Sequence, residues 1–371
     1  MMPIRILQIV GGMNMGGIEN FLMNIYRNID REKVQFDFFI HNDIEAIFED
    51  EIRDLGGKVF KIPHITKSGH MNYIKNIREF FREHKEYKII HSHYNEMSGF
   101  ILKIARQEKV KIKIAHSHSA YPKYKSFLEK IYKSYSIFLI NKNVDYRFAC
   151  SKIAGEWLFG KKEKFEIVLN GINAKNYIYN ENIRKIKRDE LKISDEEIVI
   201  GHVGRLNHAK NHKFILEIFK RLVEKNKKYK LLLIGNGELE EEIKQKIQEL
   251  KIENNVFMLG VRKDVNELMQ AFDLLLFPSI FEGLPVTLVE SQGAGLKAIV
   301  SDVVTNEIDF KCNLIKFVSL NKSADEWANI IEKEKKYERI NTSQIIKKYG
   351  YDMTENAKNL ENRYIKLYNK I

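Results

Sequence analysis

Two glutamates stand eight positions apart in the stretch FPSIFEGLPVTLVE, residues 277–290. The apolar run before Pro278 predicts a strand, and Pro285 favours the start of a helix, because proline lacks an amide hydrogen that a first helical turn leaves unpaired. Glu282 would then lie at the mouth of the helix and Glu290 more than one turn inside it. Free amides at a helix N-terminus favour an anion. Here they belong to Gly283, Leu284, Val286 and Thr287.

This arrangement suits a ligand with hydroxyl groups at both ends and an anion between them. A nucleoside diphosphate sugar has that form, with sugar hydroxyls, a diphosphate and a ribose diol. Each glutamate alone has a simpler explanation, since an acid near a helix N-terminus complements the helix dipole and an acid in mid-helix is often just solvated. The ligand interpretation therefore depends on further groups elsewhere in the chain.

Two other loops carry groups that could bind phosphate. Residues 202–211, HVGRLNHAKN, place Arg205 and Lys210 after an apolar run, where the carboxyl ends of parallel strands bind ligands. Arginine could grip a diphosphate with its planar fork and lysine as a point charge. Gly16 and Gly17 precede a predicted helix, which indicates either a phosphate contact or a tight turn. The spacing of the glycines fits neither a GxGxxG fingerprint nor a P-loop.

These loops need strands and helices around them, and the chain provides such a set twice. Residues 4–10 and 198–206 are apolar runs, and each leads through a loop into a segment with apolar residues at helical spacing. Strand–helix alternation continues after both. Apolar strands separated by helices indicate parallel sheets built from βαβ units. We therefore predict an α/β protein with two doubly wound, Rossmann-like domains.

The first domain is expected to cover residues 1–172 and the second residues 173–349. Residues 181–197 are charged and poor in apolar residues, as in a linker or a surface helix. The last segment, about 350–371, has the pattern of an amphipathic helix. It would need a partner surface to bury its apolar residues, which are Leu360, Tyr364 and Leu367.

Composition indicates a soluble globular protein. The 371 residues are 44% hydrophobic and 30% charged, with a net charge of +12. No apolar run approaches the roughly 20 residues that span a bilayer, and no secretory signal pattern is found. Cys150 and Cys312 cannot form a disulfide framework or a zinc site, so both are expected as reduced thiols in a cytoplasmic protein.

The positive charge is concentrated in residues 103–164, with fifteen basic and five acidic residues. Such a field indicates an anionic partner, which could be a lipid surface, a nucleic acid or a phosphorylated substrate. The alternative is a well-solvated surface on a lysine-rich protein.

Taken together, the motifs resemble the family 4 retaining glycosyltransferases of the GT-B fold. They follow the family order: GGIEN, two HSH segments, FACSK, VLNGIN, HVGRLNHAKN, LLLIGNGELEEEI, VFMLGVRKDV and FPSIFEGLPVTLVESQGAG. The resemblance covers nearly the whole chain. It implies two Rossmann-like domains that face each other across a cleft, with the C-terminal helix returning to the first domain. Asn173 stands where the family has an aspartate, and Asn211 where many members have a glycine.

The resemblance implies a role for each candidate residue. Arg205 and Lys210 would hold the donor diphosphate and stabilise the leaving phosphate. Glu282 and the amides after it would bind the donor sugar, and Glu290 would accept hydrogen bonds from the ribose hydroxyls. The remaining donor contacts would come from Gly16, Gly17, Gly204, Val261, Arg262, Gly283, Leu284, Pro285 and Val286, with Val261 and Arg262 near the base largely through their backbone.

A histidine at the end of a strand in the first domain usually faces the sugar in this family. KIKIAHSHSA offers His116 and His118, and the sequence does not decide between them. HSH at residues 91–93 could shape the acceptor side. A metal site from these four histidines is conceivable, but no carboxylate spacing supports it and no Asp-x-Asp motif is found, so no metal ion and no cofactor are expected.

The expected activity is metal-independent transfer of a sugar from a nucleotide sugar, with retention at the anomeric carbon. UDP-sugars are favoured as donors, with GDP-mannose second. The acceptor would be a glycan, either free or linked to polyprenyl diphosphate, in capsule or exopolysaccharide assembly. The basic, aromatic segment around residues 121–138 fits a cytoplasmic enzyme that binds the anionic inner face of the membrane.

Three other classes remain open at this point. A GT-B phosphorylase or sugar epimerase is the closest alternative. A nucleotide-cofactor oxidoreductase would also have Rossmann-like halves, although a GxGxxG fingerprint is missing. A nucleic-acid-binding protein rests on charge alone, and nucleic acid is not expected as a partner.

Overall fold

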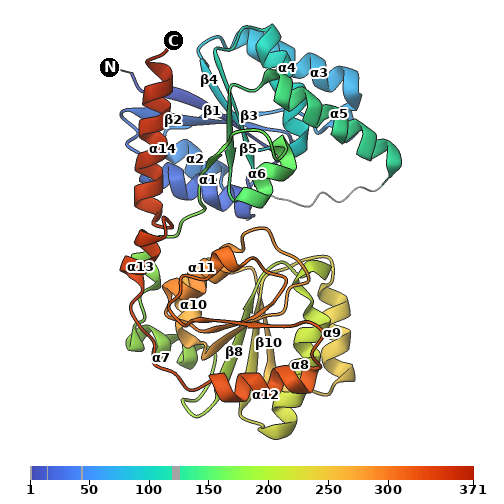
Figure 1. Ribbon diagram of the computed structural model, residues 1–371, viewed down its shortest axis with the longest axis vertical. Helices are drawn as coiled ribbons and strands as arrows, with labels where there is room; N and C mark the ends of the chain where they lie inside the picture. The colour runs from blue at the N-terminus through green and yellow to red at the C-terminus, as the bar shows by residue number, and fades with distance from the viewer. Residues whose placement is uncertain (1, 15, 43–44, 119–125) are drawn as a thin grey trace. The chain divides into compact units, whose positions relative to one another are not determined.

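The computed structural model describes residues 1–371 except 1, 15, 43–44 and 119–125. The chain divides into two compact units. Unit 1 contains Met1–Gly171 together with Met353–Ile371, and unit 2 contains Ile172–Asp352. Each unit is a parallel sheet with helices on both faces (Figure 1). The α/β class and the two doubly wound sheets predicted from the sequence are therefore confirmed.

The described part of unit 1 forms a sheet with the strand order β3-β2-β1-β4-β5-β6-β7. All neighbouring strands are parallel. Their bounds are β1 Ile4–Val10, β2 Val34–Ile40, β3 Val59–Lys61, β4 Ile89–Ser92, β5 Ile112–Ser117, β6 Tyr146–Ala149 and β7 Glu166–Ile167.

Helices cover both faces of this sheet. Side chains that follow one another along a strand point to opposite faces, so each strand packs against both layers of helices. Ile6 of β1 packs into one apolar cluster, with residues of α1 and α14, while Leu7 packs into another, with residues of α3, α4 and α6. The helices are α1 Gly17–Asn28, α2 Glu49–Asp54, α3 Ile65–Glu83, α4 Ser98–Gln107, α5 Phe127–Asn143, α6 Lys152–Phe159 and α14 Met353–Tyr368, with the 3-10 helix η1 at Asn95–Met97.

In unit 2 the strand order is β10-β9-β8-β11-β12-β13, again parallel. The strands are β8 Ile198–Val203, β9 Tyr229–Ile234, β10 Val256–Gly260, β11 Leu274–Phe277, β12 Ala298–Ser301 and β13 Ile315–Val318. Short 3-10 helices lie at η2 Ala174–Tyr177, η3 His208–Lys210, η4 Glu253–Asn255 and η5 Asn306–Ile308.

The main apolar cluster of unit 2 joins three helices to one face of the sheet, and Trp327 is its largest buried side chain. These helices are α8 His212–Lys225, α9 Glu240–Glu249 and α12 Ala324–Glu334. The other helices are α7 Glu181–Glu190, α10 Val265–Ala271, α11 Val286–Gly293 and α13 Ser343–Lys348, of which α10 and α11 lie across the sheet from α8 and α9 (Figure 1).

Two predictions, one about the final segment and one about the charged region after residue 180, can be compared with the structure. The final segment is the helix α14, which buries Leu360, Tyr364 and Leu367 within unit 1 as predicted. The charged region after residue 180 contains a helix, but α7 is not merely solvated, since Arg188 is only 1% exposed. Its guanidinium donates to Asp273 at 2.7 Å, so buried ion pairs replace the missing apolar contacts.

The described residues contain no helix that is both long enough and apolar enough to cross a bilayer.

Candidate functional site

The order of the strands fixes where each unit can bind a ligand. In a doubly wound sheet, ligands bind beyond the carboxyl ends of the two strands where the strand order reverses. In unit 2 these strands are β8 and β11, and in unit 1 they are β1 and β4. The loop with Arg205 and Lys210 follows β8, and the loop with Glu282 follows β11. The candidate phosphate and sugar residues of unit 2 therefore meet at its switch point.

Lys210 and Glu282 form the closest contact between these two loops. The Lys210 Nζ donates to Glu282 Oε1 at 2.6 Å, and the two side chains are only 15% and 12% exposed. The same ammonium lies 4.7 Å from the centre of the Phe277 ring, at the end of β11. The cation is thus held by a carboxylate and an aromatic face, at the place where a diphosphate is expected.

Backbone contacts lock the two loops together. Ile280 N donates to Ala209 O at 2.8 Å, and the Asn211 side chain donates to Pro278 O at 3.1 Å. Asn211 adopts the left-handed conformation, with φ +59°. Asparagine is among the few residues other than glycine that tolerate this region. The replacement of the family's glycine by Asn211 therefore keeps the turn and adds a hydrogen bond.

Glycines allow the loops after β8 and β9 to lie close together. Gly235 has φ +131°, and a Cβ atom there would clash with the carbonyl oxygen of Gly204. A Cβ on Gly204 would in turn lie 2.9 Å from Lys210 Cε. Gly204 therefore leaves room for the lysine side chain, which gives it a packing role in addition to the predicted nearness to a ligand.

The two arginines among the candidates are engaged differently. Arg205 is exposed, and its Nε donates to Glu238 at 3.1 Å. Arg262 is bound on both sides, with Asp264 at 2.6 Å and Glu190 at 2.9 Å. The guanidinium of Arg262 thus binds two carboxylates of unit 2, whereas the side chain of Val261 beside it is 46% exposed. The nearness of these two residues to a base stays a prediction.

Helix α11 begins at Val286, one residue later than predicted, so Pro285 is its N-cap and not its first helical residue. Pro285 has ψ 106°, an extended conformation that precedes the helix. No side chain caps this end. The first amides of an α-helix have no partner inside it, so the amides of Val286 and Thr287 are available next to Glu282. Gly283 has nothing within 4 Å of the place of a Cβ, which indicates open space there.

Glu290 projects from the second turn of α11 and accepts a hydrogen bond from the Tyr177 hydroxyl at 2.8 Å. Burial raises the pKa of Glu290 above its ordinary value, and the hydrogen bond from Tyr177 opposes this shift. Burial also raises the pKa of Tyr177, with the charge of Glu290 as a second cause. Tyr177 lies 113 residues away in the short helix η2, and no sequence motif pointed to it.

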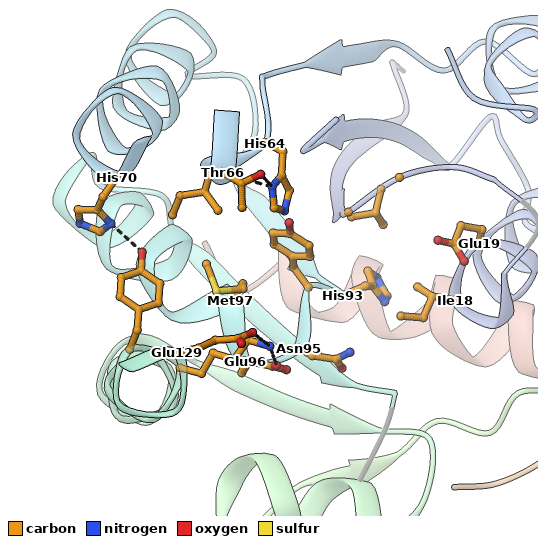
Figure 2. A pocket seen from close by; sticks show the side chains of 17 residues that line it. Ile18, Glu19, His64, Thr66, His70, His93, Asn95, Glu96, Met97 and Glu129 are labelled. Atoms are coloured by element: carbon orange, nitrogen blue, oxygen red, sulfur yellow. Dashed lines mark hydrogen bonds and ion pairs between the residues drawn. The ribbon is translucent and has the colours of Figure 1, made fainter. Parts of the chain in front are cut away.

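Unit 1 contains a cavity of about 860 Å³ at its own switch point. Its wall includes Gly11 and Gly12 after β1, and His93 to Met97 after β4. Figure 2 shows Glu19 and His93 on one side of the cavity and His70 on the other. Helix α5 contributes Glu129, Tyr132 and Lys133, and Lys133 bridges Glu96 at 2.8 Å and Glu129 at 3.1 Å.

Gly16 and Gly17 lie at the start of α1, as predicted. The carboxylate of Glu19 folds back over Gly16, since a Cβ there would clash with it. Burial raises the pKa of Glu19. A phosphate approaching Gly16 would therefore meet this acid, whereas Gly17 has nothing within 4 Å of the place of a Cβ. Of the two glycines, Gly17 is the one with free space beside it.

His116 and His118 differ in their surroundings. His116 lies within β5 and is fully buried, and neither of its ring nitrogens has a hydrogen-bond partner in the described part of the chain. His118 follows the strand and is partly exposed. Its backbone amide donates to Asn95 at 3.1 Å, and its Nε2 is 2.8 Å from Nδ1 of His93, a residue of the cavity wall. His118 is thus the one nearer to the cavity.

The opposite face of α5 is apolar and exposed. Its large apolar side chains have exposed fractions between 48% and 76%. They are Phe127, Leu128, Ile131, Tyr135 and Phe138. The helix packs on α4 through Ser136, Leu139 and Ile140, so one helix provides a wall of the cavity and an exposed apolar surface.

Comparison with known proteins gives matches over both units. Residues 15–176 match the model of Glycosyltransferase Family 4, and residues 183–353 match that of Glycosyl transferases group 1. EpsF of Bacillus subtilis strain 168, assigned as a glycosyltransferase, is 33% identical over 97% of this chain and 96% of its own length. The UDP-Gal:α-D-GlcNAc-diphosphoundecaprenol α-1,3-galactosyltransferase of Escherichia coli is 24% identical, over 78% of this chain and 81% of that protein.

Among solved structures, HepE of Anabaena in complex with UDP is similar in fold. Its TM-score is 0.75 at 18% sequence identity, over 99% of this chain and 100% of that chain.

Proposed function

The chain belongs to glycosyltransferase family 4 and has the GT-B fold, and from this premise we propose that it transfers a sugar from a nucleoside diphosphate donor to a lipid-linked glycan with retention of the anomeric configuration. Unit 2 would bind the donor and unit 1 the acceptor. The observation that carries the proposal is the pairing of Lys210 with Glu282 beside the free N-terminus of α11, at the switch point of unit 2.

The contact between Lys210 and Glu282 places the two groups that the donor needs next to each other. A diphosphate would draw Lys210 away from Glu282, because the phosphates carry more negative charge than one carboxylate. Glu282 would then be free to accept hydrogen bonds from hydroxyls of the donor sugar. The amides of Val286 and Thr287 and the exposed Arg205 would complete the anion site.

Retention requires that the acceptor oxygen attacks from the face that the phosphate leaves. In the proposed same-face mechanism, the departing phosphate oxygen takes the proton of the acceptor hydroxyl while the bond to the anomeric carbon breaks. Lys210, Arg205 and the helix amides would stabilise the charge that develops on the phosphate. These groups supply that stabilisation without a metal ion. Glu282 and Glu290 would be binding groups, rather than the acid and base of a glycosidase, which must flank the bond that breaks.

A uridine donor is the favoured choice, and GDP-mannose is the second. The complex of HepE with UDP supports this order, as does the UDP-galactose donor in the name of the Escherichia coli relative. Glu290 would accept hydrogen bonds from the ribose hydroxyls, with Tyr177 holding its carboxyl group in place. Val261 and Arg262 would lie near the base.

The acceptor would enter the cavity of unit 1. Polar and acidic side chains line it, including Glu19, Glu96 and Glu129, and carboxylates suit the hydroxyl groups of a sugar. The name of the Escherichia coli relative, with its diphosphoundecaprenol acceptor, supports a polyprenyl diphosphate carrier and a role in assembling cell-surface polysaccharide. Of the two candidate histidines, His118 would be the one that contacts a sugar, because His116 is enclosed in the core.

A lipid carrier requires contact with the membrane, and the exposed face of α5 would provide it on the cytoplasmic side. Apolar side chains with nearby lysines are typical of helices that lie in the membrane interface. Lys130 is exposed, whereas Lys133 is occupied by two glutamates, and Lys123 and Lys125 lie outside the described residues. Of these four lysines, Lys130 is the one suited to a charge-reversal test.

Flotation with vesicles of phosphatidylglycerol would test the membrane contact. Replacing Phe127 and Ile131 by serine should abolish binding, and added salt should weaken the binding of the wild type. The matched control is Ile186→Ser, since Ile186 is 62% exposed on α7 of unit 2. Unchanged flotation of the α5 variant would contradict the membrane contact but not the sugar transfer.

The donor site is tested by thermal denaturation with a panel of UDP-, GDP-, ADP- and TDP-sugars, with NAD(P) as the control. A ligand at about 100 times its dissociation constant adds roughly 2.7 kcal/mol to the free energy of unfolding. One nucleotide sugar should stabilise the wild type and fail to stabilise Glu290→Ala. Stabilisation by NAD(P) alone would instead favour the oxidoreductase interpretation.

A further inference from the structure

Four histidines form a compact group in the core of unit 1, at the ends of two neighbouring strands. His91 lies in β4 and His93 directly follows it, and likewise His116 lies in β5 and His118 directly follows it. Side chains two residues apart share one face of a strand. The His91 and His116 rings are parallel within 6°, with centroids 5.3 Å apart, and the His116 and His118 centroids are 4.0 Å apart.

Several nitrogens of this group have no partner. Within the described residues, both nitrogens of His116, Nε2 of His91 and Nδ1 of His118 are buried without a hydrogen bond. Buried polar atoms are normally paired, so a set of orphans on one small patch calls for a ligand. One nitrogen from each of His91, His93 and His116 lies within 4.8 Å of those of the other two.

The surrounding residues orient the rings as partners of metal-bound histidines do. His91 Nδ1 lies 2.6 Å from the Tyr364 hydroxyl of α14, which leaves its Nε2 unengaged. His93 Nε2 lies 2.9 Å from the side-chain oxygen of Gln8. An amide oxygen only accepts, so Nε2 of His93 carries the proton and Nδ1 offers a lone pair. That lone pair now accepts from Nε2 of His118, at 2.8 Å.

We propose that His91, His93 and His116 form a binding site for a divalent transition-metal ion such as Zn²⁺. Three imidazoles are an established ligand set for zinc, and the fourth position would be filled by His118 or by a water molecule. The cavity gives a route for the ion, because His93 forms part of its wall (Figure 2).

The ion would tie the end of β4 to the end of β5. The segment after β4 forms a wall of the cavity and the segment after β5 begins with His118, so the ion would stabilise the shape of this part of unit 1. Binding would also take the Nδ1 lone pair of His93 and thereby remove the present partner of His118. The site is built only from contacts within unit 1, and it does not rest on the proposed function.

Titration of the full chain with Co²⁺ tests this proposal. The protein must carry no histidine tag and must first be treated with a chelator, since tags and residual metal would both obscure the signal. The wild type should bind one Co²⁺ per chain with the strong visible absorption of a four-coordinate site, and Zn²⁺ should displace it. His116→Asn should abolish the absorption. His202→Asn is the matched control, because His202 is a fully buried histidine of unit 2.

Two further measurements keep the proposal open to refutation if His116→Asn fails to fold. Tyr364→Phe retains the ring but loses the hydroxyl that orients His91, and it should weaken Co²⁺ binding by about 10- to 100-fold. X-ray absorption of the zinc-loaded wild type should give only nitrogen and oxygen neighbours, at about 2.0–2.1 Å, with the signature of imidazole. Failure of the wild type to retain zinc or cobalt, or sulfur among the neighbours of zinc, would overturn the assignment.

Discussion

Replacing Lys210 by methionine removes the cation that faces Glu282 but keeps the length of the side chain. The pair is mostly buried, with its two atoms 2.6 Å apart and its side chains 15% and 12% exposed. A hydrogen bond to a charged group contributes about 1.5–3 kcal/mol, and leaving its buried partner unpaired adds a desolvation cost. We therefore expect Lys210→Met and Glu282→Gln each to lower the free energy of unfolding by about 2 kcal/mol.

The double variant separates structural pairing from ligand binding. Because the two side chains contact each other, their effects on stability should be less than additive, with a coupling energy of about 1–2 kcal/mol. Their effects on the donor should not compensate in this way, since each group is proposed to bind a different part of it. Lys210→Met should weaken UDP binding by about 10- to 100-fold, from the loss of about 1.5–3 kcal/mol. The double variant should bind UDP no better.

The assays are urea denaturation for stability and titration calorimetry for UDP. Lys263→Met is the matched control, because Lys263 is an exposed lysine of the same unit, and it should change neither quantity beyond error. Recovery of UDP affinity in the double variant would refute the reasoning, since it would mean that Lys210 and Glu282 act on the site only through their mutual contact.

Three more predictions follow from other contacts in unit 2. Tyr177→Phe removes the hydrogen bond that opposes the raised pKa of Glu290, so this carboxylate should take up its proton at a higher pH. As the pH is lowered, calorimetry should therefore show the loss of UDP affinity beginning at a higher pH than in the wild type; an unchanged pH profile would contradict the role of this pair. Burial lowers the pKa of His202 and lowers that of His212 to about 4, so the unfolded chain binds more protons below the ordinary value near 6.5. The free energy of unfolding should fall by about 1.4 kcal/mol per pH unit for each histidine between pH 6.5 and 4, and His212→Asn should flatten this slope in denaturation curves. Asn211→Ala should lower stability by about 2 kcal/mol, because it loses a hydrogen bond and strains the left-handed backbone, whereas Asn211→Gly should cost about half as much; equal losses would contradict this account.

The apolar runs of the sequence predicted the first strand of each unit and the strand before Pro278. Ile4–Val10 was predicted with its observed bounds, and the strand–helix alternation predicted two parallel sheets. The edge strands β7 and β13 were missed. Glu166–Ile167 has only two residues, and Ile315–Val318 includes an exposed lysine, so neither is a distinct apolar run.

The site was predictable in its residue types but not in its pairings. Sequence places Lys210 and Glu282 at the ends of two strands, but only the observed strand order makes β8 and β11 neighbours. The pair is separated by 72 positions, and neither residue signals its partner. The same holds for Arg188, whose buried ion pair with Asp273 spans 85 positions. Local patterns report periodicity, whereas ion pairs depend on the tertiary arrangement.

Histidines show a further limit of sequence analysis. Strand alternation puts His116 and His118 on the same side of the sheet, but it cannot say which ring is enclosed. That depends on the helices that cover the sheet, since Phe21 of α1 and Tyr364 of α14 close over the group. The tyrosine lies 273 positions from His91 in the sequence.

The most direct test of the proposed activity is the anomeric configuration of the transferred sugar. The full chain would be incubated with the nucleotide sugar that stabilises it and with a polyprenyl-diphosphate-linked sugar, and the product would be analysed by NMR. The account predicts a product that keeps the α-configuration of the donor and that is lost in Lys210→Met. A product with inverted configuration, or equal transfer by Lys210→Met, would contradict it.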